Sequence, residues 1–180
     1  MTKISKYVSL KEVTHSNTAV AKGIDNTPSD EQLELIKKCA EKVFDPVREW
    51  VGGPVKINSV FRSPGLNAAI GGSNSSQHSV GLDDSKNSYG AAFDITDTYC
   101  LRGMTNKSNS EMFNFIINNL DFDQCIHEFG TPENPRWVHF SYRPDGKNRK
   151  QILIALKNSK GKTYYVPFEG NEDKVTLIDN

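Results

Sequence analysis

Cysteine, long hydrophobic runs and an excess of charge of one sign are all scarce in this sequence, and each absence excludes a class of protein. The 180 residues contain three cysteines, an odd number with no CxxC pair. This is not the pattern of a disulfide framework, so we expect reduced or buried thiols in a protein made in the cytosol. No apolar run approaches the roughly 20 residues of a membrane-spanning helix, so we expect no membrane insertion.

The charges give no sign of a polyanionic partner. Lys and Arg together number 22, Asp and Glu together number 22, and the formal net charge is zero. No segment has the concentrated Lys/Arg excess of a nucleic-acid-binding surface, so no nucleic-acid partner is expected. The N-terminal sequence MTKISKYVSLKEVTHS lacks the apolar centre of a signal peptide. We therefore expect synthesis in the cytoplasm without a signal peptide, and a separate means of release if the protein acts outside.

The length fits one domain whose hydrophobic core is large enough to be stable without disulfide cross-links. We predict a single, monomeric domain over residues 1–180. Residues 1–26 are polar and mixed, and we expect an ordered N-terminal arm with a short helix near 17–22. The acidic residues 170–180 are expected to form a frayed tail.

Apolar spacing and capping residues predict a long first helix. Thr27 is expected to be its N-cap, with Pro28 at the first helical position. Apolar residues then recur at helical spacing. We expect Pro46 to kink or split the helix, and Gly52 with Gly53 to end it.

Two more helices and several strands complete the predicted order of elements. Ser63 and Pro64 begin a short helix that extends to residue 70, and a capping box of Ser108 and Glu111 begins a helix over 108–120. Helices and strands alternate with short connections, so we predict an α+β fold with a small, mainly antiparallel sheet and flanking helices. The predicted strands are 55–61, 91–95, 122–129, 137–142 and a hairpin of 151–156 with 163–168.

Two histidines and one aspartate form a candidate metal site. His78 lies in a polar loop, Asp94 in the short apolar run 91–95, and His139 in the strand-like segment 137–142. A carboxylate in an apolar run is costly to bury unless a cation, a metal or a hydrogen-bond network receives it. Two imidazoles and a carboxylate suit zinc with one position left open. The alternative is that the loop histidine is solvated and the strand histidine is an ordinary half-buried side chain.

Strand alternation predicts which other residues face this site. If the strands 122–129 and 137–142 pair, Glu128 lies on the same face as His139. A carboxylate there could take a proton from water activated by zinc. His127 alternates to the opposite face, and we interpret His15 and His127 as structural or surface residues. Arg62, at a strand end, could equally be an ordinary ion-pair partner.

Several motifs in their order along the chain resemble the zinc D-Ala-D-Ala carboxypeptidase family, whose fold is shared with hedgehog signalling domains and many of whose members are phage-encoded. The motifs are FRSPGLNAAIGGSNSSQH, GAAFDI, FDQCIHEFG and WVHFSY, within residues 24–165. The resemblance implies that His78, Asp94 and His139 bind Zn²⁺. It also implies that Arg62 and Ser76 face the substrate, and we assign the neighbouring Gln77 to substrate binding as well.

Two departures from the family pattern affect the expected site. Either Gly81 or Gly90 could be the motif glycine, so residues 82–89 are interpreted as an insertion that forms a flap at the rim. Several members of the family place an acidic base three residues before the last histidine, where this chain has Arg136. We therefore assign the base to Glu128, with Glu133 as a second choice.

The resemblance implies a zinc metallopeptidase that hydrolyses peptide bonds in the stem peptides or cross-links of bacterial peptidoglycan. It leaves open whether the protein is an endolysin-like endopeptidase or a D-Ala-D-Ala carboxypeptidase. It also implies a phage-encoded protein that acts on the cell wall after release or from the virion. The alternative is a non-catalytic zinc-containing binding or virion structural module of the same fold. Retention of Glu128 and Arg62 favours the enzyme over the module.

Overall fold

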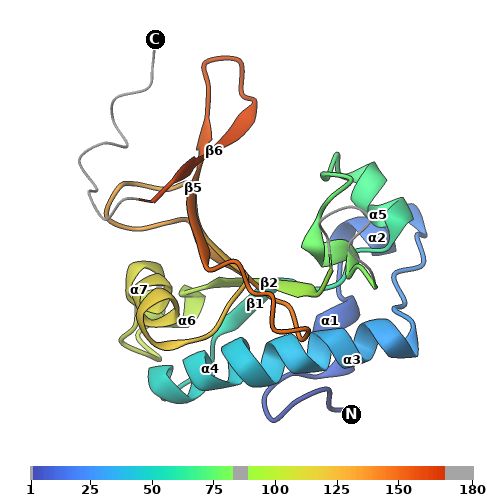
Figure 1. The fold of residues 1–180 in the computed structure, drawn as a ribbon, viewed down its shortest axis with the longest axis horizontal. Helices are drawn as coiled ribbons and strands as arrows, with labels where there is room; N and C mark the ends of the chain where they lie inside the picture. Colours follow the sequence, from blue (N-terminus) through green and yellow to red (C-terminus); the bar gives the residue numbers. More distant parts are fainter. Residues whose placement is uncertain (1, 83–88, 169–180) are drawn as a thin grey trace.

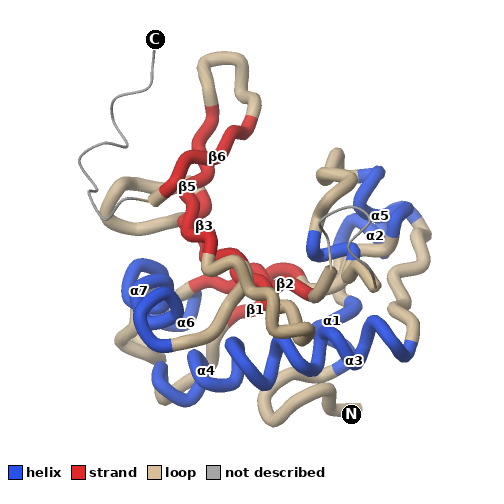
Figure 2. Tube along the Cα trace, in the orientation of Figure 1, coloured by secondary structure: helices blue, strands red, loops and turns tan. Residues whose placement is uncertain are grey.

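The computed structural model describes residues 2–82 and 89–168, and its centre is a six-stranded sheet (Figures 1 and 2). The strands lie in the order β1-β2-β4-β3-β5-β6. All neighbours pair antiparallel except β3 and β5, which are parallel. The strands are β1 (Lys56–Ser59), β2 (Ala91–Thr96), β3 (Gln124–Glu128), β4 (Trp137–Tyr142), β5 (Gln151–Lys157) and β6 (Thr163–Pro167).

The main helices cover one face of this sheet, and the core lies between them. Helix α3 (Asp30–Cys39) continues through a π-helical segment, η1 (Ala40–Phe44), into α4 (Asp45–Val51), and α7 (Asn109–Asn119) lies beside them (Figure 1). Phe93 of β2 stacks on one side against Phe44 and on the other against Phe140 of β4, with ring centroids 5.6 Å apart in both pairs. The α+β class with a mostly antiparallel sheet, predicted from the sequence, is confirmed.

The remaining helical segments are short, and they lie in the connections before and between the strands. They are α1 (Leu10–Thr14), α2 (Asn17–Lys22), α5 (Pro64–Ala69), the 3₁₀ turn η2 (Gln77–Ser79) and α6 (Thr98–Leu101). The structure confirms the predicted helix near 17–22 and the Ser63 cap of α5. It also confirms the capping box of Ser108 and Glu111 at the start of α7.

The predicted start of the first long helix is wrong by two residues. Ser29, not Thr27, is the N-cap of α3, and its side chain forms a capping box with Gln32. The Thr27 amide and hydroxyl instead bind the Asp25 carboxylate, at 3.0 and 2.6 Å. This local turn occupies Thr27, and Pro28 consequently precedes the helix rather than beginning it.

The predicted disturbance at Pro46 is confirmed, and its form is a π-helical segment. Proline has no amide hydrogen and its ring crowds the carbonyl four residues earlier, so the preceding turn cannot keep regular α-helical bonds. The Asp45 amide accordingly donates to the carbonyl of Ala40, five residues back. The helix then ends where predicted, at Gly52, whose φ of +68° is a conformation that favours glycine.

The N-terminal segment packs more deeply than an arm of polar composition would. Val8 and Val13 are 1% and 0% exposed and belong to the main core. The sequence analysis missed α1, whose capping box of Ser9 and Glu12 is the signal that could have located it.

Two predicted segments fall largely outside the described residues. These are the inserted flap over 82–89, of which only the ends are described, and the tail over 170–180. The flanking residues Gly81 and Tyr89 form an isolated parallel bridge. No helix within residues 2–82 and 89–168 is long and apolar enough to cross a membrane.

Candidate metal centre

A groove of about 850 Å³ contains the candidate metal ligands. Strand alternation explains its position, because Phe93 and Phe140 point into the core while Asp94 and His139, one residue along, point to the opposite face. Ile126, Leu153 and Phe129 give the groove an apolar part of its lining, and they pack in one cluster with the buried Ala155.

His78 reaches the groove from η2, beside the sheet. The Ser76 side chain caps this turn by accepting from the His78 amide at 3.3 Å. The His78 Nδ1 lies 2.8 Å from the backbone oxygen of Val60. A carbonyl only accepts, so Nδ1 carries the proton and Nε2 of the neutral ring presents its lone pair to the groove. This is the arrangement in which a protein fixes the tautomer of a metal-binding histidine.

Asp94 and His139 face His78 from two adjacent strands. They are direct partners in the antiparallel pairing of β2 with β4. The Asp94 carboxylate lies 2.9 Å from His139 Nδ1 and 3.1 Å from His78 Nε2, and the two ring nitrogens are 3.2 Å apart. One ligand atom from each of the three side chains lies within 4.8 Å of the others. The structure therefore brings together the three residues that the sequence analysis selected.

The chemistry of these donors fits a bound Zn²⁺. Burial lowers the pKa of His78, which favours the neutral form that coordinates metal. Burial alone would raise the pKa of Asp94, but the charges and hydrogen bonds of His78 and His139 hold it well below its usual range. When His78 is neutral, its Nε2 lone pair and the Asp94 carboxylate, 3.1 Å apart, are two donors that a single cation can bridge. Nitrogen and oxygen donors of this kind suit zinc.

Arg62 lies at the edge of the three-residue cluster. Its backbone amide donates to the oxygen of His78 at 2.8 Å, and its Nε donates to the Ser59 hydroxyl at 3.2 Å. One guanidinium nitrogen lies 3.5 Å from Asp94. Burial lowers the pKa of Arg62, with Asp94 and Glu128 opposing that effect. The position puts a cation beside the cluster and within the groove.

Glu128 lies on the same face of the sheet as His139, as strand alternation predicted. It is 7% exposed and contributes to the groove. Burial raises the pKa of Glu128 to about 7; His139 and Arg62 act against this rise and Asp94 adds to it. A carboxylate with a pKa near neutrality can both accept and return a proton at physiological pH.

Glu133, the second choice for the base, is placed differently. It is exposed in the loop between β3 and β4, and its pKa is lowered by a hydrogen bond with Thr131. It is not among the residues that line the groove. His127 is also turned away from the groove: it is buried, packs edge-on against Phe113, and its Nε2 lies 2.9 Å from the oxygen of Thr131.

Ser76 and Gln77 both line the groove, but their contacts differ. Ser76 is half-buried, and its hydroxyl accepts the bond from His78 described above. Gln77 is buried, and its amide nitrogen donates to the Asp123 carboxylate at 2.9 Å and to the oxygen of Tyr89 at 3.2 Å. These two bonds tie the turn that carries His78 to the sheet, while the expected contact of Gln77 with substrate stays a prediction.

The sequence analysis missed the groove residues that come from β5 and β6. Strand alternation could have identified Thr163 and Tyr165 as neighbours on one face, but no motif indicated which face. The groove residues that lie outside every motif named in the sequence analysis are Arg149, Gln151, Leu153, Thr163 and Tyr165.

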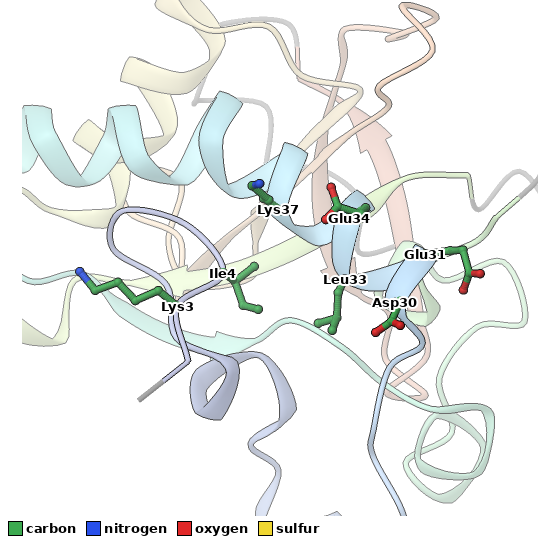
Figure 3. A pocket seen from close by; sticks show the side chains of 7 residues that line it. All are labelled: Lys3, Ile4, Asp30, Glu31, Leu33, Glu34 and Lys37. Atoms are coloured by element: carbon green, nitrogen blue, oxygen red, sulfur yellow. The ribbon is translucent and has the colours of Figure 1, made fainter.

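Two further hollows differ in their relation to the cluster. One, of about 460 Å³, shares Arg62, Asp94 and Ile70 with the groove and continues toward α2 and β1. The other lies between the N-terminal segment and the start of α3, away from the cluster (Figure 3). Surface side chains line it and it contains no candidate ligand set, so we assign it no role. Its lining residues are Lys3, Ile4, Asp30, Glu31, Leu33, Glu34 and Lys37.

Comparison with the profiles of protein families provides a match. The profile of the peptidase M15 family matches residues 6–141, which include the three candidate ligands, Arg62 and Glu128. The comparison with curated proteins finds no relative that matches the chain.

Proposed function

The chain belongs to the peptidase M15 family, and from this premise we propose that it is a zinc-dependent peptidase that hydrolyses peptide bonds of bacterial peptidoglycan. The observation that carries the proposal is the convergence of His78, Asp94 and His139 in one groove with a carboxylate whose pKa is about 7. A purely structural metal site has no need of such a carboxylate.

In this proposal His78, Asp94 and His139 hold the metal. Bound zinc supplies a Lewis acid and lowers the pKa of a coordinated water to roughly 7. Glu128 takes the proton from the attacking water and returns it to the leaving amine, which its pKa permits near neutral pH. Arg62 orients a carbonyl or carboxylate of the substrate, and Ser76 and Gln77 contribute polar contacts.

The shape of the groove favours cleavage within a polymer over removal of a terminal residue. A carboxypeptidase needs a cleft closed at one end by a cation, whereas an endopeptidase needs room on both sides of the cut. The groove and the second hollow share Arg62, Ile70 and Asp94 in their linings, which supports room for substrate on both sides of the cluster. We therefore propose an endopeptidase of the endolysin type, phage-encoded and acting on the wall after release or from the virion.

Digestion of purified peptidoglycan tests the proposal. Zinc-loaded protein is expected to create new amino termini within stem peptides or cross-bridges, identified by mass spectrometry. Chelation of the metal, or Glu128→Gln, is expected to abolish them. Release of free D-alanine as the sole product would assign the protein as a carboxypeptidase instead. An unchanged digest with zinc-loaded protein would contradict the proposed activity.

A further inference from the structure

The β5–β6 hairpin forms one wall of the groove, and it lies outside the part of the chain that matches the family profile. That match ends at residue 141, and the hairpin begins at Gln151. Figure 1 shows the hairpin extending away from the helices. Four of its residues nevertheless line the groove: Gln151, Leu153, Thr163 and Tyr165. This wall is therefore a part of the groove that the family profile does not cover.

Strand register places one hairpin residue in line with Glu128. Glu128 of β3 pairs with Ala155 of β5, and Ala155 pairs with Tyr165 of β6. Residues opposite each other in a sheet point to the same face, so the three side chains form one row across three strands. The middle member is an alanine, 0% exposed, which leaves room above it for the longer side chains on either side.

Tyr165 has the properties of a ligand contact rather than of a core residue. It lines the groove yet is 53% exposed, whereas the aromatic residues of the core are almost completely buried. Its phenol is protonated at neutral pH, as in an ordinary tyrosine, and burial raises its pKa further. A protonated phenol in the lining of the groove can donate a hydrogen bond to a bound ligand.

We propose that Tyr165 is a substrate-binding residue, and that its hydroxyl donates a hydrogen bond to the peptide segment that lies over Glu128. The inference rests on the proposed peptidase function and deepens it, because it assigns substrate recognition to an element outside the matched family region. The ring adds an apolar surface to a groove whose lining already includes Ile126 and Leu153.

The same strand supplies a matched control. Tyr164 precedes Tyr165, pairs with Leu156 and therefore points to the other face of the sheet. It does not line the groove. Tyr164→Phe and Tyr165→Phe each remove one hydroxyl from the same strand, and only the second removes it from the groove.

Binding is measured in zinc-loaded protein that carries Glu128→Gln, so that the ligand is not consumed. The probe is the mixture of cross-linked disaccharide-peptides that a muramidase releases from peptidoglycan, titrated by calorimetry. Adding Tyr165→Phe is expected to weaken binding about tenfold, the value of one net hydrogen bond. Adding Tyr164→Phe is expected to leave it unchanged, and zinc content and melting temperature should be equal in all three proteins.

In the otherwise unaltered enzyme, Tyr165→Phe is expected to raise KM about tenfold with little change in kcat, since the bond is made to substrate and transition state alike. Equal binding with and without the Tyr165 hydroxyl, or equal weakening by the two substitutions, would overturn its role while leaving the peptidase function standing. Failure of the Glu128→Gln protein to bind the fragments at all would overturn the proposed function and this role with it.

Discussion

Two carboxylates, the half-buried Asp94 and the buried Asp123, differ in the partners that surround them. Both have a pKa held below the usual range even though burial opposes it. The Asp123 side chain is fully buried and receives two guanidinium bonds from Arg149 at 2.6 and 2.9 Å, a backbone amide at 3.0 Å and the Gln77 amide at 2.9 Å. All of these donors are guanidinium or amide N–H groups, which keep their protons at any physiological pH.

Asp94 is not surrounded by N–H donors of this kind. Its nearest partners are two ring nitrogens, one of which has already used its proton on the oxygen of Val60. Arg62, at 3.5 Å, is a weak partner. Burial and a low pKa are therefore common to both sites and do not identify a metal centre. The identity of the neighbouring atoms distinguishes the two sites, because Asp94 lies among ring nitrogens that can be metal ligands, whereas Asp123 lies among N–H donors that cannot.

Exchanging each aspartate for asparagine tests this difference most directly. Asp94→Asn is expected to remove most of the bound zinc and essentially all zinc-dependent hydrolysis, because a ligand charge is lost. His78→Ala and His139→Ala should do the same, while His127→Ala keeps its zinc. Elemental analysis of the purified proteins measures this. Full zinc content in the Asp94→Asn protein would show that Asp94 is not a ligand.

Glu128 is a buried carboxylate in the same groove as Asp94, and its substitution should separate chemistry from metal binding. Glu128→Gln keeps the size of the side chain but cannot accept a proton. We expect zinc to remain and turnover to fall by roughly two or more orders of magnitude, the range for loss of a general base. Glu133→Gln is the comparison variant, expected to be near normal. The reverse result in steady-state assays would move the base to Glu133.

The same residue should make the metal-free protein less stable as the pH rises. In the folded protein the pKa of Glu128 is about 7, against 4.5 for an unshifted glutamate. The folded state therefore binds more protons between pH 4.5 and 7, so stability falls across that window and the cost is complete above pH 7. Glu128→Gln should remove this loss. The free energy of unfolding of the variant is therefore expected to exceed that of the unaltered protein by about 3 kcal/mol at pH 8 and by almost nothing at pH 4. Urea unfolding of both proteins in the presence of a chelator, at several pH values, measures the difference.

Asp123→Asn should have the smallest effect and the opposite character to Asp94→Asn. Loss of a charged acceptor with several donors is expected to cost about 2 kcal/mol of folding free energy, with zinc still bound. Because the folded pKa of Asp123 lies below 3.8, the cost is present above that pH and disappears as the carboxylate is protonated. Denaturant unfolding at pH 7 gives the value. Loss of zinc without loss of stability would mean that Asp123 acts mainly on the turn of His78.

Local patterns predicted those parts of the site that depend on local geometry. Alternation within β3 and β4 placed Glu128 and His139 on one face, and the structure has them there. The capping residues of α5 and α7 were also predicted correctly. The start of α3 was predicted wrongly, because Thr27 and Ser29 can both act as its N-cap. The hydrogen bonds of Thr27 to Asp25 leave Ser29 as the N-cap.

The contacts that sequence could not predict join distant segments. Asp123 meets Arg149 and Gln77 across separations of 26 and 46 residues, and no spacing rule connects them. The row from Glu128 through Ala155 to Tyr165 depends on the parallel pairing of β3 with β5, which follows only from the complete sheet. The candidate ligands and the candidate base could be predicted from motifs, whereas the other residues that line the groove depend on the order of the strands in the sheet.

The place of β4 in the sheet has a consequence for the order of events during synthesis. This strand lies between β2 and β3 and carries His139, although it follows both in the chain. Until residues 137–142 have been synthesised, β2 and β3 have no common partner and only two of the three candidate ligands are present. The strand that joins β2 to β3 in the sheet is therefore also the strand that completes the candidate site.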